Sequence, residues 1–281
     1  MNCEVAEEPE TYWDIDYWEP EPLKPRGLDI TQLGGLISYG GGVDSSALVI
    51  LLINRGWRGH IAFADTGAEM PETYCFMDYF EASWLRPRGL AITHLKGMPW
   101  QRVGGGETLI EKCQRNRVIP LLFNRWCTVE WKIKPLARYA KSLGLDPANT
   151  MVGIDAGEAW RQKGRNCPLV EEGIDRQGCV EIIRAEGLEV PRKSGCWICP
   201  GQRISQWRQL WQEHPDLFER AARLEENAGR NERSKRSNVT LDPHGRFTLR
   251  QLQRGFEAQM VMWSEDDMDA LREYQPCVCS L

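Results

Sequence analysis

The sequence predicts a doubly wound α/β fold, in which a mainly parallel sheet carries helices on both faces. Short apolar runs alternate along the chain with longer segments of helical periodicity, the pattern of repeated strand–helix units. The first apolar run ends in three glycines and leads directly into a helix, as strands do at the carboxyl edge of such sheets. With 281 residues and 42% hydrophobic content, the chain can supply a sizeable core.

Each expected strand is an apolar run bounded by glycine or polar residues, and these strands are 33–40, 60–67, 89–95 and 150–155. The expected helices are 43–56, 71–85 and 128–144. The second helix begins at Pro71, which suits a first helical position, and carries apolar residues at spacings of three and four. The third contains an internal Pro135.

Charge and hydropathy predict the organisation of the rest. Residues 1–30 hold nine acidic and two basic side chains and are expected to form an acidic tail. An α/β domain is expected at 31–165, and a helical region with a cysteine cluster at 166–281. Because no apolar run approaches the roughly 20 residues that span a bilayer, and the N-terminus lacks the features of a secretion signal, we expect a cytoplasmic protein without a membrane partner.

The segment "YGGGVDSS" at 39–46 predicts a binding site for an anion. Glycines 40–42 have no Cβ, so their N–H groups can turn inward, and the helix that follows adds the positive end of its dipole. Ser45 and Ser46 are expected to add hydroxyl donors. A tight turn with only a structural role is the alternative, because a glycine-rich turn alone is weak evidence.

The same segment resembles the phosphate-binding loop of the PP-loop ATP pyrophosphatase superfamily, whose pattern is S-G-G-x-D-S. The matching residues are Gly41, Gly42, Asp44 and Ser45. Gly40 stands where the motif has its first serine, and Ser38 lies two residues earlier as a candidate replacement. The resemblance implies an adenine nucleotide alpha hydrolase-like fold that binds ATP with Mg²⁺.

A second segment resembles one branch of this superfamily. "DTGAEMPET" at 65–73 is similar to the D-T-G-x-x-x-P-E-T segment of the phosphoadenosine phosphosulfate (PAPS) reductase-like branch. The resemblance implies that Asp65 and Thr66 lie beside the adenine or the ribose of the nucleotide. A strand end that is capped by its own turn is the alternative.

Two further segments extend the likeness. "RWCTVEWKIKP" at 125–135 resembles the R-x-C-T-x-x-x-K-I-x-P segment of the branch, including its members that insert sulfur into DNA. "GIDAGEAWRQ" at 153–162 resembles a strand-to-helix turn of the superfamily. The resemblance implies that Gly153, Glu158 and Arg161 face the triphosphate, and that Asp44 and Arg161 are catalytic.

Four of the ten cysteines are candidate metal ligands, namely Cys127, Cys179, Cys196 and Cys199. Cys196 and Cys199 form a C-x-x-C turn, which lets two thiolates point at one ion. Four thiolates complete a tetrahedral set, which binds zinc or an iron–sulfur cluster. Related sulfur-inserting members use such clusters, and this resemblance favours [4Fe–4S] over Zn²⁺. Alternatively, Cys127 and Cys179 are buried apolar residues and the C-x-x-C is a redox pair.

The resemblance implies an enzyme that adenylates a substrate with ATP and prepares it for sulfur insertion. Nucleic acid is the expected substrate, in contact with the arginine-rich stretch 203–254 unless those arginines only solvate helices. A cysteine desulfurase is the expected sulfur donor. Three interpretations remain for Cys277 and Cys279: they carry a persulfide, they bind a metal, or they have no role. Two other classes remain: a sulfonucleotide reductase acting on PAPS or adenosine phosphosulfate, and a non-catalytic, metal-stabilised nucleotide-binding component of a modification complex.

Overall fold

The computed structural model describes residues 33–97, 106–122, 124–230 and 240–258 of the chain. The predicted acidic tail at 1–30 lies outside these ranges, and so do Cys277 and Cys279.

Four parallel strands form one sheet, in the order β3-β2-β1-β4. They are β1 (Leu36–Tyr39), β2 (His60–Asp65), β3 (Ile92–Lys96) and β4 (Met151–Val152). The register pairs Ser38 of β1 with Ala62 on one side and with Val152 on the other. The chain runs outward from β1 to β3 and then returns to the opposite side of β1, so the strand order reverses between β1 and β4.

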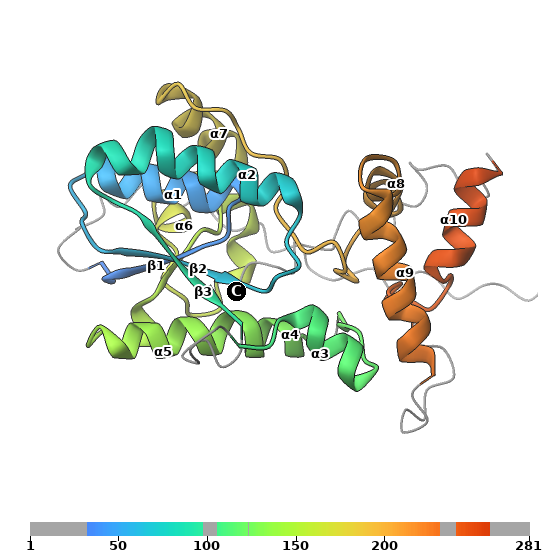
Figure 1. Ribbon diagram of the computed structural model, residues 1–281. Helices are drawn as coiled ribbons and strands as arrows, with labels where there is room; N and C mark the ends of the chain where they lie inside the picture. Colours follow the sequence, from blue (N-terminus) through green and yellow to red (C-terminus); the bar gives the residue numbers. More distant parts are fainter. Residues whose placement is uncertain (1–32, 98–105, 123, 231–239, 259–281) are drawn as a thin grey trace, which may run out of the picture.

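Helices cover both faces of this sheet, which confirms the predicted doubly wound α/β fold (Figure 1). α1 (Val43–Asn54), α2 (Pro71–Phe80) and α7 (Arg176–Ala185) lie over one face, and α5 (Lys134–Ser142) lies under the other. α1 is apolar on nearly all sides, as suits a helix that packs between a sheet and a second helix. α7 supplies that second helix, so the α/β layers continue past residue 165.

The expected helix at 128–144 is present and contains a wider turn. α4 (Trp126–Thr128) runs into a π-helical turn (Val129–Ile133), which continues directly as α5. Pro135 is the second residue of α5. Because proline has no N–H to donate and its ring crowds the preceding turn, a π-helical turn at this point accommodates it without breaking the helix.

A helical unit packs beside the α/β layers (Figure 1). It comprises α3 (Leu109–Asn116), α8 (Ile204–Glu213), α9 (Pro215–Gly229) and α10 (Leu249–Glu257). These helices share a core in which Trp207 and Phe218 are buried. The short α6 (Pro168–Glu171), a π-helical turn (Glu81–Leu85) and three 3₁₀ turns (Arg86–Arg88, Pro147–Asn149 and Ala156–Arg161) complete the described elements. None of the helices in the described ranges has the length and hydropathy that crossing a bilayer requires.

Candidate functional site

The glycine turn after β1 and the turn after β4 face each other where the strand order reverses. Ligands of open α/β sheets bind at this kind of position, outside the carboxyl ends of the strands. Gly41 has a φ of +70°, a left-handed conformation that favours glycine. Gly153 packs directly on the first turn of α1, since a Cβ there would lie 2.6 Å from both the N and the Cα atom of Ser45. These two glycines therefore bring both turns to the start of α1.

The amides of the glycine turn are held by a hydroxyl group. Gly40 N and Gly42 N donate to Ser45 Oγ over 3.2 and 3.3 Å. Because the acceptor is a rotatable hydroxyl rather than a carbonyl oxygen, an incoming phosphate oxygen can replace it while the backbone stays in place. Ser38, the candidate for the missing motif serine, lies within β1 and not in the turn.

Ser46 requires a correction, because its side chain is fully buried. Its Oγ donates to Gly42 O over 2.9 Å and lies 3.1 Å from the Tyr39 hydroxyl. These contacts fix the turn to β1 from the inside of the fold. The hydroxyl of Ser46 is thus a structural group and does not face a ligand.

Three carboxylates gather beside the glycine turn. Oxygen atoms of Asp44, Asp155 and Glu158 all lie within 4.8 Å of one another. Burial, together with the charges of Asp44 and Glu158, raises the pKa of Asp155 to about 6. Asp155 was not among the residues expected here. Asp155 Oδ1 accepts a hydrogen bond from Glu158 N over 3.2 Å and so caps the turn at Ala156–Arg161. The sequence signal for Asp155 was its place inside the motif at 153–162.

Two arginines balance these carboxylates. Arg161 is buried and forms an ion pair with Glu158. Arg176, at the start of α7, binds Asp44 with 2.6 Å between Nη1 and Oδ1. Burial raises the pKa of Asp44 even though Arg176 acts in the opposite direction. The site thus combines acidic groups suited to a cation with guanidinium groups suited to phosphate.

Asp65 and Thr66 at the end of β2 organise the turn that follows them. Asp65 Oδ1 accepts hydrogen bonds from Gly67 N over 2.8 Å and from the Tyr74 hydroxyl over 2.6 Å. Thr66 is buried, and its hydroxyl donates to Glu69 over 3.2 Å. Thr66 also lines the cysteine cavity described next, so this residue lies on the side of the cysteines.

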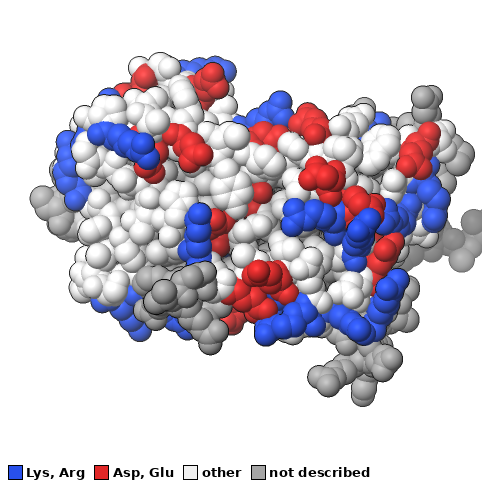
Figure 2. Space-filling model, viewed as in Figure 1, with Lys and Arg blue, Asp and Glu red and all other residues white. Residues whose placement is uncertain are grey.

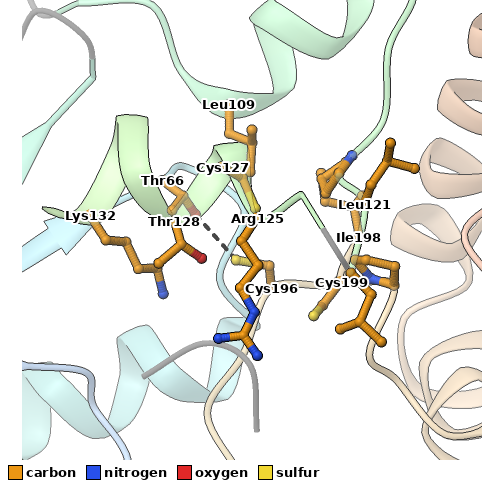
Figure 3. A pocket seen from close by; sticks show the side chains of 13 residues that line it. Thr66, Leu109, Leu121, Arg125, Cys127, Thr128, Lys132, Cys196, Ile198 and Cys199 are labelled. Carbon is orange, nitrogen blue, oxygen red and sulfur yellow. Dashed lines mark hydrogen bonds between the residues drawn. The ribbon is translucent and has the colours of Figure 1, made fainter. Parts of the chain in front are cut away.

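Three of the four candidate metal ligands line one cavity, which is partly open to solvent (Figure 3). Cys127 comes from α4, and Cys196 and Cys199 come from the C-x-x-C turn. Arg125 and Lys132 supply positive charge to the same walls. Thiolates bind metals and react as nucleophiles, and nearby cations favour the thiolate form.

Backbone pairing places the C-x-x-C turn against the end of β2. Met70 N donates to Gly195 O and Trp197 N donates to Ala68 O, both over 2.9 Å, as in a short antiparallel ladder. Cys199 N then donates to Cys196 O over 3.0 Å and closes the turn. This pairing links segments that lie more than 100 residues apart in the sequence.

The buried Glu69 connects this turn to the helix of Cys127. Its Oε1 accepts from Cys196 Sγ over 3.3 Å and lies 3.1 Å from Lys132 Nζ. Neither Glu69 nor Lys132 was singled out as a site residue. Glu69 lies inside the motif at 65–73 and Lys132 inside the motif at 125–135. Their places in these motifs were the sequence signal that could have identified them.

Cys179, the fourth expected ligand, lies elsewhere. It is fully buried in α7, in the core that this helix forms with α1, and it does not line the cysteine cavity. Burial, reinforced by the charges of Asp44 and Asp155, raises the pKa of its thiol. Cys179 therefore acts as a small apolar residue that lets α7 approach α1.

The remaining described cysteines give no second cluster within the described ranges. Cys75 is exposed, whereas Cys113 and Cys167 are buried. Burial raises the pKa of Cys113 to about 12 and that of Cys167 to about 11, which keeps both protonated and unreactive.

The described arginines of the stretch 203–254 are largely paired with acids. Arg250 binds Glu219 and Glu226, and Arg223 binds Glu219. Figure 2 shows acidic and basic side chains intermixed over the C-terminal helices. Such a surface matches the alternative of solvated helices better than it matches a phosphate-binding patch.

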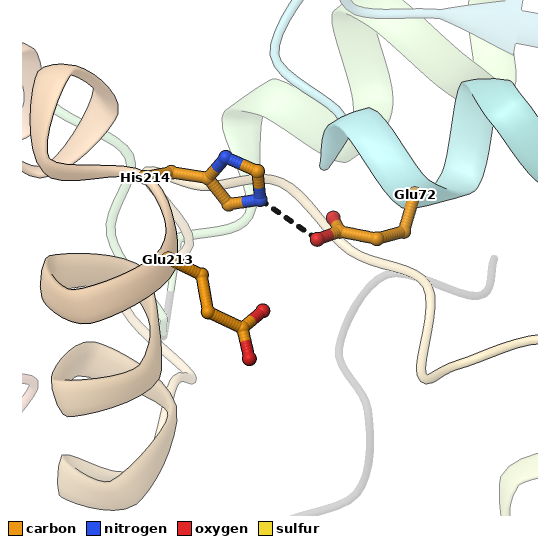
Figure 4. Close-up of side chains that lie close together, drawn as sticks. All are labelled: Glu72, Glu213 and His214. Atoms are coloured by element: carbon orange, nitrogen blue, oxygen red, sulfur yellow. Dashed lines mark hydrogen bonds and ion pairs between the residues drawn. The ribbon is translucent and has the colours of Figure 1, made fainter.

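A third polar group joins the helical unit to the α/β layers (Figure 4). His214 Nε2 lies 2.7 Å from Glu72 Oε1 at the start of α2, and Glu213 lies close to both. Arg192 already balances this group, since its Nη1 lies 2.9 Å from Glu213 and 3.8 Å from Glu72. The group therefore forms an ion-pair network that holds α8 and α9 on α2.

Comparison with known families gives one domain match. Residues 35–151 match the family model described as the phosphoadenosine phosphosulfate reductase domain. This part of the chain is therefore similar to a PAPS reductase domain. This domain contains the glycine turn and Cys127, while Arg161, Arg176 and the C-x-x-C turn follow it in the sequence.

Similar individual proteins are distant. An uncharacterized protein of Methanocaldococcus jannaschii is 24% identical over 206 residues, which make up 66% of this chain. The chain spans 40% of the length of that relative. Among solved structures, a PAPS reductase from Candida auris in a phosphate complex matches with 16% identity and a TM-score of 0.39. That match covers 60% of this chain and 84% of the other chain.

Proposed function

We propose that the PAPS reductase-like domain and the segment after it bind ATP with Mg²⁺ and adenylate an acceptor, which is thereby prepared for sulfur insertion. The observation that carries this proposal is the group of three carboxylates, Asp44, Asp155 and Glu158, beside an anion-binding turn. A metal-bound triphosphate needs oxygen ligands for the cation and N–H donors for the phosphates at one place.

The three carboxylates fit Mg²⁺, which prefers oxygen ligands and is commonly held by one or two carboxylates plus phosphate oxygens. Bound there, Mg²⁺ would neutralise charge that develops on the leaving pyrophosphate. The amides of Gly40 and Gly42 would hold the phosphates at the helix N-terminus. Arg161 and Arg176 would exchange their carboxylate partners for phosphate oxygens, which offer the same planar recognition of the guanidinium group.

In the proposed reaction an acceptor oxygen attacks the α-phosphorus of ATP, and the bond from that phosphorus to the pyrophosphate oxygen breaks. Pyrophosphate leaves, and the acceptor carries AMP. A sulfur nucleophile then displaces AMP from the acceptor. The residues named above contribute mainly by positioning the reactants and by stabilising charge on the leaving group.

The cysteine cavity supports an iron–sulfur cluster as the sulfur-handling group. A single zinc ion holds its thiolates about 3.8 Å apart, as tetrahedral Zn–S bonds of about 2.3 Å require. Among the described residues, the three cavity cysteines do not form a group whose ligand atoms all lie within 4.8 Å. A cluster binds its thiolates at separate iron atoms, and three cysteines would leave one iron open to a sulfur ligand.

The acceptor that we propose is a nucleic acid, and the sulfur donor is a persulfide-forming partner such as a cysteine desulfurase. Both follow from the likeness of the motif at 125–135 to sulfur-inserting members of the branch. The cavity is also lined by Arg125 and Lys132, which can attract a polyanion or an anionic sulfur species.

The test is pyrophosphate release from ATP by the full chain, purified without oxygen and supplied with Mg²⁺ and candidate nucleic acids. We expect Asp155→Asn to abolish Mg²⁺-dependent release, because it removes one charge from the cation site. Asp78→Asn is the matched control, since Asp78 is an exposed carboxylate on α2. Full Mg²⁺-dependent release by Asp155→Asn would contradict the proposed site.

Sulfonucleotide reduction is the second candidate, and the family match at 35–151 favours it. A reductase would bind PAPS or adenosine phosphosulfate at the same turn and release sulfite, without cleaving ATP to AMP and pyrophosphate. Supplying these compounds with a thiol reductant distinguishes the two reactions. ATP binding without either reaction would instead indicate a non-catalytic nucleotide-binding component.

A further inference from the structure

Trp160 exposes a large aromatic ring beside the proposed ATP site. Its exposed fraction is 59%, the highest of the large hydrophobic residues in the described ranges that are exposed. It lies in the turn after β4, between Glu158 and Arg161, whose side chains take part in the proposed site. A tryptophan ring normally buries most of its surface, so an exposed ring at the rim of a site indicates a partner that stacks on it.

Positive charge gathers near this ring. Burial lowers the pKa of Arg165, and the positive charges of Arg161 and Arg125 lower it further, which places the three guanidinium groups in one neighbourhood. Lys163 is exposed in the same turn region. Within the described ranges Arg125, Lys163 and Arg165 form no ion pair, in contrast to the paired arginines of α9 and α10.

The backbone of two of these cations is also unusual. Arg125 and Lys163 have φ values of 44° and 43°, in the left-handed region that residues other than glycine seldom adopt. Each such residue costs on the order of 1 kcal/mol or more, and such strain concentrates at functional sites. Arg125 lines the cysteine cavity (Figure 3), and Arg161 pairs with Glu158 of the carboxylate group.

We propose that Trp160, Arg125, Lys163 and Arg165 form the binding surface for a single-stranded part of the acceptor nucleic acid, with one unpaired base stacked on the indole ring. This proposal rests on the proposed function and adds to it the place and the conformation of the acceptor. An acceptor must reach both the α-phosphate of ATP and the sulfur at the cysteines. Trp160 adjoins Arg161 at the first of these places, and Arg125 lines the pocket at the second. Stacking on an aromatic ring requires an unpaired base, and a track of cations suits the phosphates on either side of it.

The experiment measures fluorescence anisotropy of labelled strands of about 15 nucleotides, long enough to cover a single-strand site. The full chain is titrated with single-stranded DNA, single-stranded RNA and the matching duplexes. We expect single strands to bind more tightly than duplexes, and the DNA and RNA arms identify the source of the strand. Trp160→Ala should weaken single-strand binding by about 5-fold to 150-fold, while Trp160→Phe retains most of it.

Two charge variants complete the test. Arg165→Gln should weaken strand binding. It should also reduce the slope of log affinity against log salt concentration by about one, because one fewer counterion is released. Arg223→Gln removes a paired arginine from α9 and should leave binding unchanged. Equal binding of strands by the wild type and Trp160→Ala, or no binding of strands by the wild type, would overturn the proposal.

ATP affinity, measured on the same variants, separates this proposal from the proposed function. If Trp160→Ala weakens ATP binding and leaves strand binding intact, the ring stacks on adenine and the acceptor surface is wrong. If pyrophosphate release is absent but strand binding depends on Trp160, the surface stands and the adenylation reaction is wrong.

Discussion

Alanine at position 153 would place a methyl group inside the contact between β4 and α1. The new Cβ would lie 2.6 Å from Ser45 N and Cα and 2.8 Å from the carbonyl carbon of Asp44. Ordinary contact begins at 3.4 Å, so the two backbones must separate by about 0.8 Å. All three obstructing atoms belong to the backbone, and no side-chain rotation can relieve the contact. Overpacking of this kind costs about 1–3 kcal/mol.

Urea and thermal unfolding measure this cost directly. For a chain of this size each kcal/mol lowers Tm by about 2–4 °C, so Gly153→Ala should lose a readily measured number of degrees. Since Ser45 also holds the amides of the glycine turn, the same shift should weaken the proposed binding of ATP, and misplacement by about 1 Å can cost about 100-fold in the rate of a reaction.

The control is Gly229→Ala at the end of α9, where a Cβ would meet no atom of the described residues within 4 Å. That variant should gain about 0.4–1 kcal/mol, because alanine restricts the unfolded chain more than glycine does. If Gly153→Ala unfolds at the wild-type temperature and binds ATP as the wild type does, the packing argument for this glycine is wrong.

Two further outcomes follow from the cysteine assignment and from a buried carboxyl. Cys196→Ala should lose the iron and acid-labile sulfide of the proposed cluster in elemental analysis, whereas Cys179→Ala should keep both and lose only packing stability; equal metal loss in the two would restore Cys179 as a ligand. Burial raises the pKa of Glu225 to about 7 from an ordinary 4.5, so its protonated form favours the folded chain. This contribution is complete below pH 4.5 and is lost as the pH rises through about 7. Urea unfolding measures the free energy of unfolding of the wild type relative to Glu225→Gln. This relative stability should fall by on the order of 3 kcal/mol between pH 4.5 and about 7, and a constant difference would refute the titration.

The strands, helices and glycine turn were predictable because their signals are local. An apolar run followed by three glycines and a helix specifies a strand end whatever the rest of the chain does. Asp44 and Arg161 were predicted as site residues from short motifs for the same reason. The order of the strands in the sheet then brings these two residues together, because it places the turn after β4 beside the turn after β1.

The missed residues depend on contacts between distant segments. Arg176 reaches Asp44 across 132 positions, and no spacing rule relates the two. Cys179 carries a thiol, as a metal ligand does, but it lies in the core between α7 and α1. The spacing of the cysteines could not separate these roles, because a buried cysteine and a metal-binding cysteine are the same residue type in the sequence.

The packing of α7 on α1 also limits how the molecule can be divided. The matched family region ends at residue 151, yet the helix that covers α1 begins at Arg176. A fragment cut at the end of that region would leave Leu48 and its apolar neighbours in water and would lose the arginine partner of Asp44. Any minimal piece made for crystallisation or transplanted into another protein must therefore run at least through Ala185, so that it keeps both the covering helix and the arginine beside the glycine turn.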